Sequence, residues 1–252
     1  MRRSAFKILT PLVGAVVFLA AWHIAIVILR EDTPMAAYFA PIEALNAGVK
    51  LAAKGAIADH TIDSLRRVVV ALFFALVVGT PIGLLIGVSR LFERSTSLLF
   101  QFLRMVSPLS WMPVAVIALG VGDAPVYFLL AFAALWPIIL NVGAGVKAID
   151  PQWLLLAKSL AANKTEVLSR VILPAIVDHL LTGVRLAIGI IWIVLVPAEM
   201  LGVQAGLGYF ILDCRDRMEY GELTAAILWI GALGAALDFA ARTLRQIWRG
   251  RR

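Results

Sequence analysis

The chain has 252 residues, of which 62% are hydrophobic and 15% are charged, and its mean hydropathy is +0.92. A soluble fold keeps most of its residues near water and cannot hide such a composition, which also excludes disorder, collagen and a disulfide scaffold. The net charge of +7 would suggest nucleic acid as a partner of a soluble protein, but here the basic residues flank long apolar stretches, so we expect a membrane protein that binds no nucleic acid.

Six apolar stretches predict an all-helical membrane protein, because a helix of about 20 apolar residues covers the roughly 30 Å of a bilayer core. They comprise residues 8–29, 68–88, 98–119, 124–146, 176–201 and 223–240. Three basic residues precede the first stretch as in a signal peptide, but its apolar run is longer than the about 7–15 residues of a cleavable core. We therefore expect about six spans within a single membrane domain, residues 1–252.

The lysines and arginines between the spans predict the orientation of the chain. Six crossings put both termini on one face, which carries 14 basic residues against 7 on the other. Since cytoplasmic loops are enriched in lysine and arginine, we expect a multi-pass protein of the plasma membrane, the inner membrane of a bacterium, with both termini cytoplasmic. Arg90 and Lys164 would then lie inside, whereas Lys54 and Cys214 would lie outside. Cys214, the single cysteine, can form no internal disulfide and is expected to be a bystander thiol.

Between the first two stretches, apolar residues recur at helical spacing beside a polar stripe. Ile42, Leu45 and Val49 belong to the apolar face, and Glu43 and Lys50 belong to the polar stripe. This pattern predicts a helix that lies in the outer membrane surface. Membrane anchoring and the docking of an outside partner are both consistent with it.

The third stretch contains Pro108 and Pro113, which remove two amide donors within a few residues. Irregular backbone at membrane depth is tolerated only where protein or a watery cavity surrounds it. We therefore expect Ser107, Ser110 and Trp111 to lie at a translocation pathway between two copies of the chain.

Three further candidate pathway residues, Arg104, Arg185 and Glu199, are ionisable and lie within predicted spans. Such a group costs several kcal/mol unless it finds a partner, a cavity or the membrane interface. The two arginines either brace or snorkel, or they present positive potential to an anion leaving the pathway. Glu199 is either a structural counter-charge or a gate residue. Asp238 and Arg242 are spaced as an ordinary i,i+4 pair.

The segment after the fourth stretch predicts two short cytoplasmic helices. Asp150 followed by Pro151 is an N-cap with proline at the first helical position. Asn163 offers a second N-cap, and Glu166 stands at the capping-box position. The second helix is expected to end before Pro174, because a proline ring disfavours helical geometry in the residue before it.

The first of these helices displays Trp153 and the leucines 154–156 in the cytoplasm, so these side chains need something to bury them. The protein's own bundle is one explanation. The other is a groove on a cytoplasmic partner that receives the helix.

Enzymatic chemistry is missing from the sequence. No G-x-x-x-x-G-K-[ST] phosphate loop occurs, so we expect the chain to bind no cofactor and to hydrolyse no ATP. The stretch that ends at Asp123 mimics the glycine-x-glycine-aspartate signature of intramembrane aspartyl proteases, but no earlier span supplies the second aspartate that their chemistry needs. His23, His60 and His179 lack metal-ligand spacing. We expect neither a catalytic residue nor a metal site.

Four stretches carry a family resemblance: Ser107-Pro108-Leu109-Ser110-Trp111-Met112-Pro113, Thr182-Gly183-Val184-Arg185, Ala198-Glu199-Met200-Leu201 and Gly206-Leu207-Gly208-Tyr209. In order and spacing they resemble the permeases, the integral membrane subunits of binding-protein-dependent ATP-binding-cassette importers. The likeness is to the subgroup that serves nitrate, bicarbonate, cyanate, taurine and alkanesulfonates, and it runs over about residues 59–242.

The cytoplasmic segment is similar to the family's loop pattern of Glu-Ala-Ala, three residues, Gly, nine residues, Ile, one residue and Leu-Pro. Leu173 and Pro174 match its end, and Ala157 matches its second alanine. Val171 stands at the isoleucine position and Ala161 at the glycine position.

The resemblance implies a permease fold with a coupling helix at about residues 150–162, inside a coupling segment at about 147–174. It implies as partners two cytoplasmic ATPase subunits that use ATP and Mg, a second permease copy and an external substrate-binding protein. The residues that it places against the ATPase are Asp150, Trp153, Leu154, Leu155, Ala157, Lys158 and Ala161.

We therefore expect a permease that is not itself an enzyme and that forms the pathway for a small anion, namely nitrate, bicarbonate, cyanate or an organosulfonate such as taurine. A self-sufficient channel or secondary carrier is the alternative, but it would need an internal repeat or paired intramembrane acids. A third hypothesis, a purely structural subunit, would leave the exposed leucines and the broken third span without a role.

Overall fold

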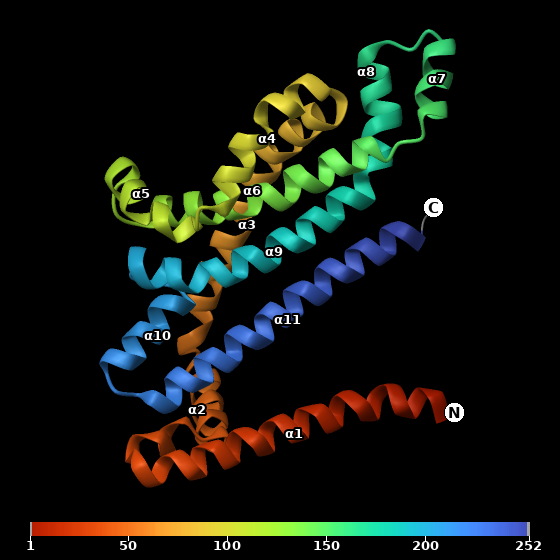
Figure 1. Cartoon of the computed structure of the whole chain (residues 1–252). Coiled ribbons are helices and arrows are strands. Elements are labelled where there is room, and N and C mark those ends of the chain that lie inside the picture. Colours follow the sequence, from red (N-terminus) through yellow and green to blue (C-terminus); the bar gives the residue numbers. More distant parts are fainter. Residues whose placement is uncertain (1, 251–252) are drawn as a thin grey trace. The chain divides into compact units, whose positions relative to one another are not determined.

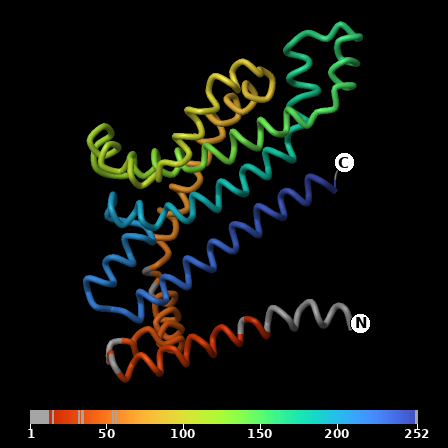
Figure 2. The backbone as a smooth tube through the Cα atoms, in the orientation of Figure 1, coloured from red at the N-terminus to blue at the C-terminus, as the bar shows by residue number. Residues whose placement is uncertain are grey.

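The computed structural model describes residues 2–250, apart from the side chains of residues 2–12, 15, 32, 34, 35, 54 and 56 (Figures 1 and 2). All regular elements among the described residues are helices, which confirms the predicted all-helical class. The chain divides into two compact units. The first consists of Met1–His60 and Phe210–Gly231, and the second consists of Thr61–Tyr209 and Ala232–Arg252.

The first unit contains α1 (Arg2–Asp32), the 3-10 helix η1 (Pro34–Phe39) and α2 (Pro41–Lys54). It also takes in the start of α3 (Ala56–Val88), most of α10 (Leu207–Asp216) and the start of α11 (Tyr220–Gly250). The rings of Tyr38 and Phe39 lie against Tyr220, with centroids 6.3 and 5.5 Å away. These contacts join η1 to the start of α11.

Helix α2 confirms the helix predicted between the first two apolar stretches. It begins at Pro41 and ends at Lys54, and the C-cap Gly55 has a φ of +67°, a left-handed conformation that favours glycine. Ile42, Leu45 and Val49 are exposed, as the apolar face of an interfacial helix should be. Whether this face serves anchoring or docking stays a prediction.

Cys214 of α10 is fully buried in the first unit. Burial raises the pKa of its thiol to about 11, so the thiol stays protonated at neutral pH. A buried, protonated thiol reacts poorly with alkylating reagents, which makes Cys214 a poor reporter of membrane orientation.

The second unit is built around α6 (Asp123–Lys147) and α9 (Leu173–Gly202), which lie side by side (Figure 1). Its other elements are the remainder of α3, α4 (Arg90–Met105), η2 (Pro108–Trp111), α5 (Met112–Leu119), α7 (Pro151–Ser159), α8 (Lys164–Glu166), the π-helical segment Val167–Ile172 and the end of α11. Leu129 and Ile138 of α6 are fully buried in one core with Ile191 and Leu195 of α9.

Helix α3 approaches α6 closely through glycines spaced four residues apart, Gly79, Gly83 and Gly87. A Cβ atom added at Gly83 would lie 2.7 Å from the Cβ of Val142 and 2.8 Å from the carbonyl oxygen of Ile139. Small residues at this spacing let two helix backbones pack closely inside a membrane, where burial of apolar surface adds little. The sequence analysis did not recognise this stripe.

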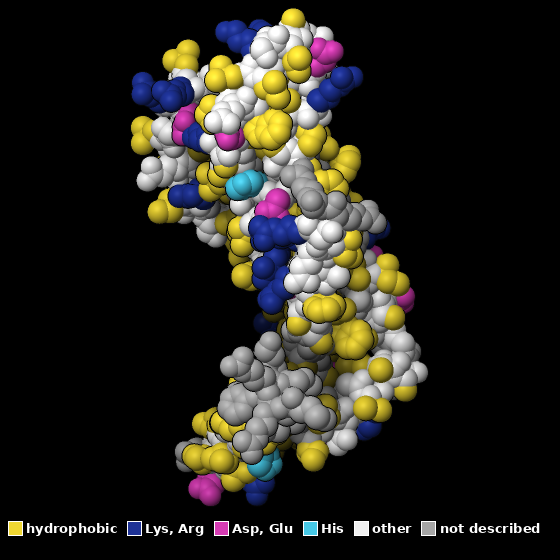
Figure 3. Space-filling view, turned by 90° about the vertical axis from the view of Figure 1, so that its right-hand side faces the viewer, with side chains coloured by type: hydrophobic (Ala, Val, Ile, Leu, Met, Phe, Trp, Pro, Cys, Tyr) yellow, Lys and Arg dark blue, Asp and Glu magenta, His cyan; other side chains and the backbone are white. Residues whose placement is uncertain are grey.

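Four helices among the described residues are long and apolar enough to cross a membrane: Ile57–Val88, Asp123–Lys147, Lys164–Gly202 and Tyr220–Gly250. They correspond to four of the six predicted spans. The first predicted span lies in α1, and the side chains of its N-terminal part fall outside the described residues. Large apolar side chains such as Leu98 and Ile117 are exposed at 80% and 86%, which suits a lipid-facing surface. Figure 3 shows hydrophobic side chains at many places on the face that it draws.

The third predicted span is not one straight helix. It consists of α4 and the η2–α5 segment, which meet at an angle of 89°. The break falls at Val106–Ser107, just before Pro108, because proline at this point cannot donate to the helix ladder. The predicted irregular backbone is confirmed, whereas the boundaries 98–119 are corrected, since α4 already begins at Arg90 and the chain turns sharply within the stretch.

The cytoplasmic segment begins as its capping residues predict. The Asp150 carboxylate accepts the backbone N–H of Gln152 at 2.9 Å and starts α7. Asn163 and Glu166 form the predicted capping box, each side chain accepting the other residue's backbone N–H at 2.8 and 2.9 Å. Two short polar motifs therefore determine where both helices start.

The expectation that the second helix ends before Pro174 is wrong, because α8 runs on through the π-helical segment into α9. At the end of this segment Leu173 donates its N–H to the carbonyl of Leu168, five residues back. The wider π turn shifts the carbonyls that the Pro174 ring would meet in a regular α-helix. A proline that usually ends a helix is accommodated here inside one.

Helix α7 ends in a Schellman motif, in which Ala162 donates to the carbonyl of Ala157 and Ala161 donates to the carbonyl of Lys158, both at 3.0 Å. Ala161 has a φ of +53°, so an L-residue occupies the left-handed position that usually holds glycine. This conformation explains why the related loop pattern has glycine at this position.

We expect the Gly83→Ala substitution to lower stability by about 1–3 kcal/mol, because the new methyl group overlaps Val142 and the Ile139 carbonyl. Gly189→Ala is the matched control: it lies in α9, its Cβ would meet no atom within 4 Å, and it should stabilise by about 0.5–1 kcal/mol. Thermal unfolding in detergent measures both. Equal melting temperatures for the two variants would contradict the close packing.

Candidate functional site

Helix α7 presents an apolar face that its own unit leaves uncovered. Trp153, Leu155 and Leu160 are 61%, 65% and 73% exposed, whereas Ala157 is buried against the following helix. A groove of about 280 Å³ beside this face is lined by Trp153, Leu156, Ala157, Leu160, Ala162, Glu166, Val167, Arg170 and Val171. Of the predicted coupling residues, Leu154, Lys158 and Ala161 are also exposed, and Asp150 caps the helix.

The break between α4 and α5 brings together the predicted pathway residues of the third stretch. Ser107 and Ser110 are exposed, and the carbonyl of Ser107 accepts the backbone N–H of Ser110 at 3.0 Å. Trp111 is half-buried, with its ring centroid 6.0 Å from that of Phe132 on α6. The aromatic contact holds the broken segment against the core of the second unit.

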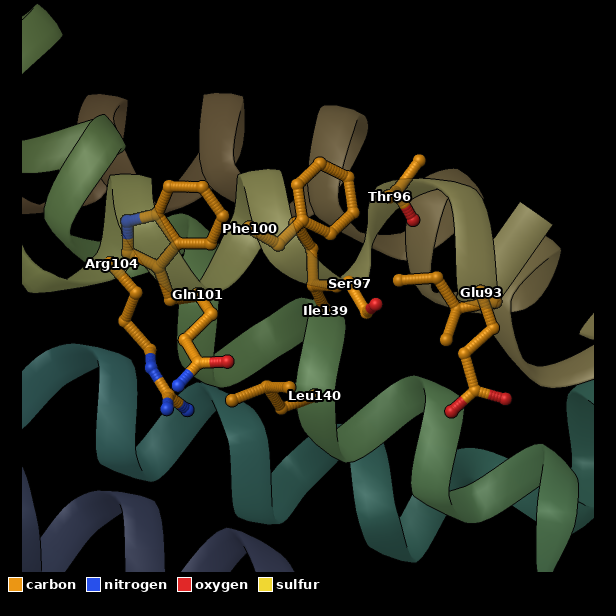
Figure 4. A pocket seen from close by; sticks show the side chains of 10 residues that line it. Glu93, Thr96, Ser97, Phe100, Gln101, Arg104, Ile139 and Leu140 are labelled. Carbon is orange, nitrogen blue, oxygen red and sulfur yellow. The ribbon is translucent and has the colours of Figure 1, made fainter.

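Arg104, just before this break, lines two neighbouring cavities. Figure 4 shows one of them, with Arg104 among its lining side chains. Within the part of the chain that the structure describes, its guanidinium has neither an ion pair nor a hydrogen bond to protein. Gln101 lies one turn earlier on α4, and both side chains extend toward the same side of the cavity (Figure 4). A cation without a protein counter-charge can attract an anion.

Arg185 has a different environment. Its Nε lies 2.7 Å from Oδ1 of Asp238 on α11, and Asp238 also pairs with Arg242, as predicted from their spacing. A second ionic contact joins the same two helices, because Asp178 accepts hydrogen bonds from Arg245 at 3.0 Å and from Arg249 at 2.9 Å. These contacts favour the bracing explanation for Arg185.

Glu199 lies at the centre of a buried polar network. Its carboxylate accepts hydrogen bonds from Arg67 Nη1 at 2.6 Å, from Ser64 Oγ at 2.7 Å and from the Gly208 N–H at 2.8 Å. Glu199 and Ser64 are fully buried and Arg67 is 2% exposed. Arg67 Nε also donates to Asp123 at 2.8 Å, so the network links α3, the start of α6 and the end of α9. The contacts favour the counter-charge explanation for Glu199.

The same network holds the loop between α9 and α10. Arg67 donates to the carbonyl of Ala205 at 2.9 Å, and Ser64 accepts the N–H of Leu207 at 2.9 Å. Gly206 has a φ of +105°, and a Cβ there would collide with both charged groups of the ion pair. The glycine therefore lets the backbone approach the buried charges directly.

The sequence analysis missed Ser64, Arg67 and Asp123 as partners of Glu199. It began the second span at residue 68, which left Arg67 in a loop, whereas α3 begins at Ala56. A signal was present in the spacing, because the buried positions 64, 67, 68, 71 and 75 recur at helical intervals and continue into the apolar stretch.

The sequence of this chain is similar to those of known transport proteins. The family described as "Binding-protein-dependent transport system inner membrane component" matches residues 79–249. The chain is 36% identical over 193 residues to the bicarbonate transport system permease protein CmpB of Synechococcus elongatus, covering 75% of this chain and 69% of that protein. It is 36% identical over 175 residues to the nitrate import permease protein NrtB of Leptolyngbya laminosa, covering 69% of this chain and 63% of that protein.

The fold is also found among solved structures. The MetNI methionine ABC transporter in its inward-facing conformations superposes with a TM-score of 0.60 at 17% identity, covering 73% of this chain and 92% of that chain. An amino acid ABC transporter crystallised with histidines gives a TM-score of 0.60 at 16% identity, covering 81% of this chain and 97% of that chain. The chain thus shares its helical fold with chains of these two ABC transporter structures.

The chain belongs to the family of inner membrane components of binding-protein-dependent transport systems. Within that family it is a permease, the membrane subunit of an importer, as the resemblance in its sequence implied. The relatives support this function over a self-sufficient channel or secondary carrier.

We expect Glu199→Gln to lower stability by up to about 3–5 kcal/mol, because it removes the fully buried carboxylate of the ion pair and leaves the Arg67 guanidinium with the partly exposed Asp123 as its remaining counter-charge. Asp216→Asn, at an exposed carboxylate beside Arg215, should cost less than about 1 kcal/mol. Thermal unfolding in detergent compares the two variants. A Glu199→Gln protein as stable as Asp216→Asn would show that the buried pair stabilises little.

Proposed function

We propose that this permease forms the translocation pathway for a small monovalent anion in an ATP-driven importer. Its relatives CmpB and NrtB are named for bicarbonate and nitrate, and Arg104 offers a positive charge at the cavities beside the broken third span. Of the substrates considered from the sequence, nitrate, bicarbonate and cyanate each carry one negative charge, and taurine carries a negatively charged sulfonate beside its ammonium group. An external binding protein would deliver the anion to the permease.

The observation that carries the proposal is the place of α7 in the chain. It lies in sequence between α6 and α9, the two principal helices of the second unit. α7 follows α6 after three residues and joins α9 through α8 and the π-helical segment. A partner that displaces α7 would therefore move α6 and α9, whose shared core fills this unit. The exposed Trp153 and Leu155 offer such a partner an apolar contact.

The proposal includes two kinds of partner, inside the cell and within the membrane. Two cytoplasmic ATPase subunits would receive the α7 helices of two permease copies and would supply the energy from ATP and Mg, while this chain hydrolyses nothing. Ser107, Ser110 and Trp111 would line the pathway with Arg104, between the two copies. Arg185 and Glu199 would support the pathway by bracing its helices.

The proposed orientation places α7 and both termini in the cytoplasm and α10 outside, with residues 1–252 forming one membrane domain in the lipid of the inner membrane. The support for it is the excess of basic residues on the face that carries the termini, 14 against 7.

Leu155→Asp is expected to abolish recovery of the ATPase with the permease, because it introduces a charge into an apolar contact at a cost of several kcal/mol. Leu155 is 65% exposed, so folding should be unaffected. Gln152→Asp, which adds the same charge at an exposed position one turn earlier on α7, is the control and should recover the ATPase normally. Co-purification from membranes measures both; equal recovery from both variants would eliminate the coupling role.

Orientation is tested with engineered thiols in a Cys214→Ala background, since the native thiol is buried. Lys164→Cys and Asp216→Cys both place a thiol at an exposed position. A membrane-impermeant maleimide added to intact cells should label only Asp216→Cys, and permeabilisation should expose Lys164→Cys. Labelling of Lys164→Cys in intact cells would mean that the chain is inserted in the opposite orientation.

A further inference from the structure

Residues 241–250, which we call the α11 end, are amphipathic. They carry three arginines and no acidic residue, and the arginines are Arg242, Arg245 and Arg249. At about 3.6 residues per turn, these three positions fall within about 60° of one another on the helix surface. Leu244 and Ile247 lie on the other side of the same turns and are 55% and 54% exposed. The α11 end therefore has a basic face and an exposed apolar face.

This combination indicates where the α11 end lies relative to a bilayer. α11 has 31 residues, which makes it about 46 Å long, more than the roughly 30 Å of a bilayer core. Its predicted span ends at Ala240, yet apolar side chains stay exposed beyond that point. Trp248, in the same turns, is of a residue type that concentrates at membrane surfaces. The α11 end therefore fits the level of the lipid headgroups.

The basic face is held by two carboxylates of which each is shared by two arginines. Asp178 of α9 accepts Nε and Nη2 of Arg245, both at 3.0 Å, and Nε and Nη2 of Arg249, both at 2.9 Å. Asp238 of α11 pairs with Arg185 of α9 and with Arg242. One arginine is enough to neutralise one carboxylate. Each of the two groups therefore keeps one positive charge in excess.

The excess charge lies at the surface, on Arg242 and Arg249, whose side chains are 56% and 62% exposed. Asp178 fixes the guanidinium of Arg249 through Nε and Nη2, and within the described part of the chain its Nη1 donates to no protein group. A planar guanidinium that is held in one orientation with free N–H donors is suited to binding the oxygens of a phosphate.

We propose that the α11 end and the neighbouring part of α9 bind the phosphate of an anionic phospholipid, at the membrane face that carries both termini. Arg242 and Arg249 supply the charge and the donors, and Leu244 and Ile247 contact the acyl chains of the bilayer. In the sequence Arg251 and Arg252 follow and add positive charge. This inference does not depend on which substrate the permease carries.

The two faces together favour a lipid over other phosphate or acidic ligands. A free phosphate ion or an acidic protein surface would satisfy the arginines but would leave Leu244 and Ile247 in water. A zwitterionic lipid such as phosphatidylcholine carries an ammonium group beside its phosphate, which cancels its attraction to the excess positive charge. Phosphatidylglycerol carries one net negative charge and is the type of lipid that the site should select.

The site is tested by thermal unfolding of the purified permease–ATPase complex in an uncharged detergent, titrated with short-chain phosphatidylglycerol, short-chain phosphatidylcholine or sodium phosphate. A ligand that binds the folded state raises the melting temperature. Phosphatidylglycerol should raise it for the parent more than either other compound. Arg242→Gln and Arg249→Gln should each weaken the apparent affinity for phosphatidylglycerol about fivefold. Both variants should fold, because Asp238 keeps Arg185 and Asp178 keeps Arg245 as a partner.

Arg94→Gln is the matched control. Arg94 is exposed on α4 and is expected on the same membrane face, so the substitution removes the same charge outside the site. It should keep the parent's response to phosphatidylglycerol. An equal loss of affinity in Arg94→Gln would mean that the basic membrane face attracts anionic lipid as a whole, which would overturn the site. Because Arg242 and Arg249 belong to different ion-pair groups, either variant alone keeps the test valid if the other fails to fold.

Three further results would overturn the anionic-lipid site. The first is equal stabilisation of the parent by phosphatidylglycerol and phosphatidylcholine, and the second is equal stabilisation by phosphatidylglycerol and sodium phosphate. The third is a parent-like response to phosphatidylglycerol from Arg242→Gln and Arg249→Gln. If this third result came with loss of the ATPase on co-purification, the basic face would be assigned to the ATPase instead.

Discussion

The buried ion pair between Arg67 and Glu199 is the interaction on which the second unit depends. Removing two charges from water costs several kcal/mol each, and the cost is offset only when every remaining donor and acceptor is satisfied. Here the carboxylate takes three donors and the guanidinium reaches a second carboxylate and a carbonyl. Because these partners come from α3, the start of α6, the end of α9 and the following loop, satisfying the charges fixes all four segments together.

The arginines of the second unit differ in how their charge is neutralised. Arg67, Arg185 and Arg245 each contact a carboxylate of another helix at 3.0 Å or less. Arg104 is exposed, lines two cavities and contacts no carboxylate among the described residues. A charged side chain that pairs with a carboxylate of another helix stabilises the helix bundle. A charged side chain at a cavity without such a partner can interact with a ligand.

Both local contacts and tertiary packing determine the helices of the coupling segment, residues 147–174. Asp150 and the Asn163–Glu166 capping box start two helices through contacts a few residues apart, which makes them readable from sequence. The π-helical turn that carries the chain past Pro174 depends on how α8 and α9 are placed together. As a result α7 is followed, after a turn at residues 160–163, by one continuous helix, Lys164–Gly202, that enters the core.

The sequence by itself determined the helical class, most of the spans, the caps of the coupling segment and the family, because apolar length, capping chemistry and motif spacing are local properties of the chain. It also located the broken third span from two prolines. Only the tertiary structure decided the partners of the buried charges, since Ser64 and Arg67 lie more than 130 residues from Glu199 in the chain. It likewise decided that Arg185 braces two helices while Arg104 faces a cavity with Trp136, because two arginines in similar apolar sequence differ only in what the fold places beside them.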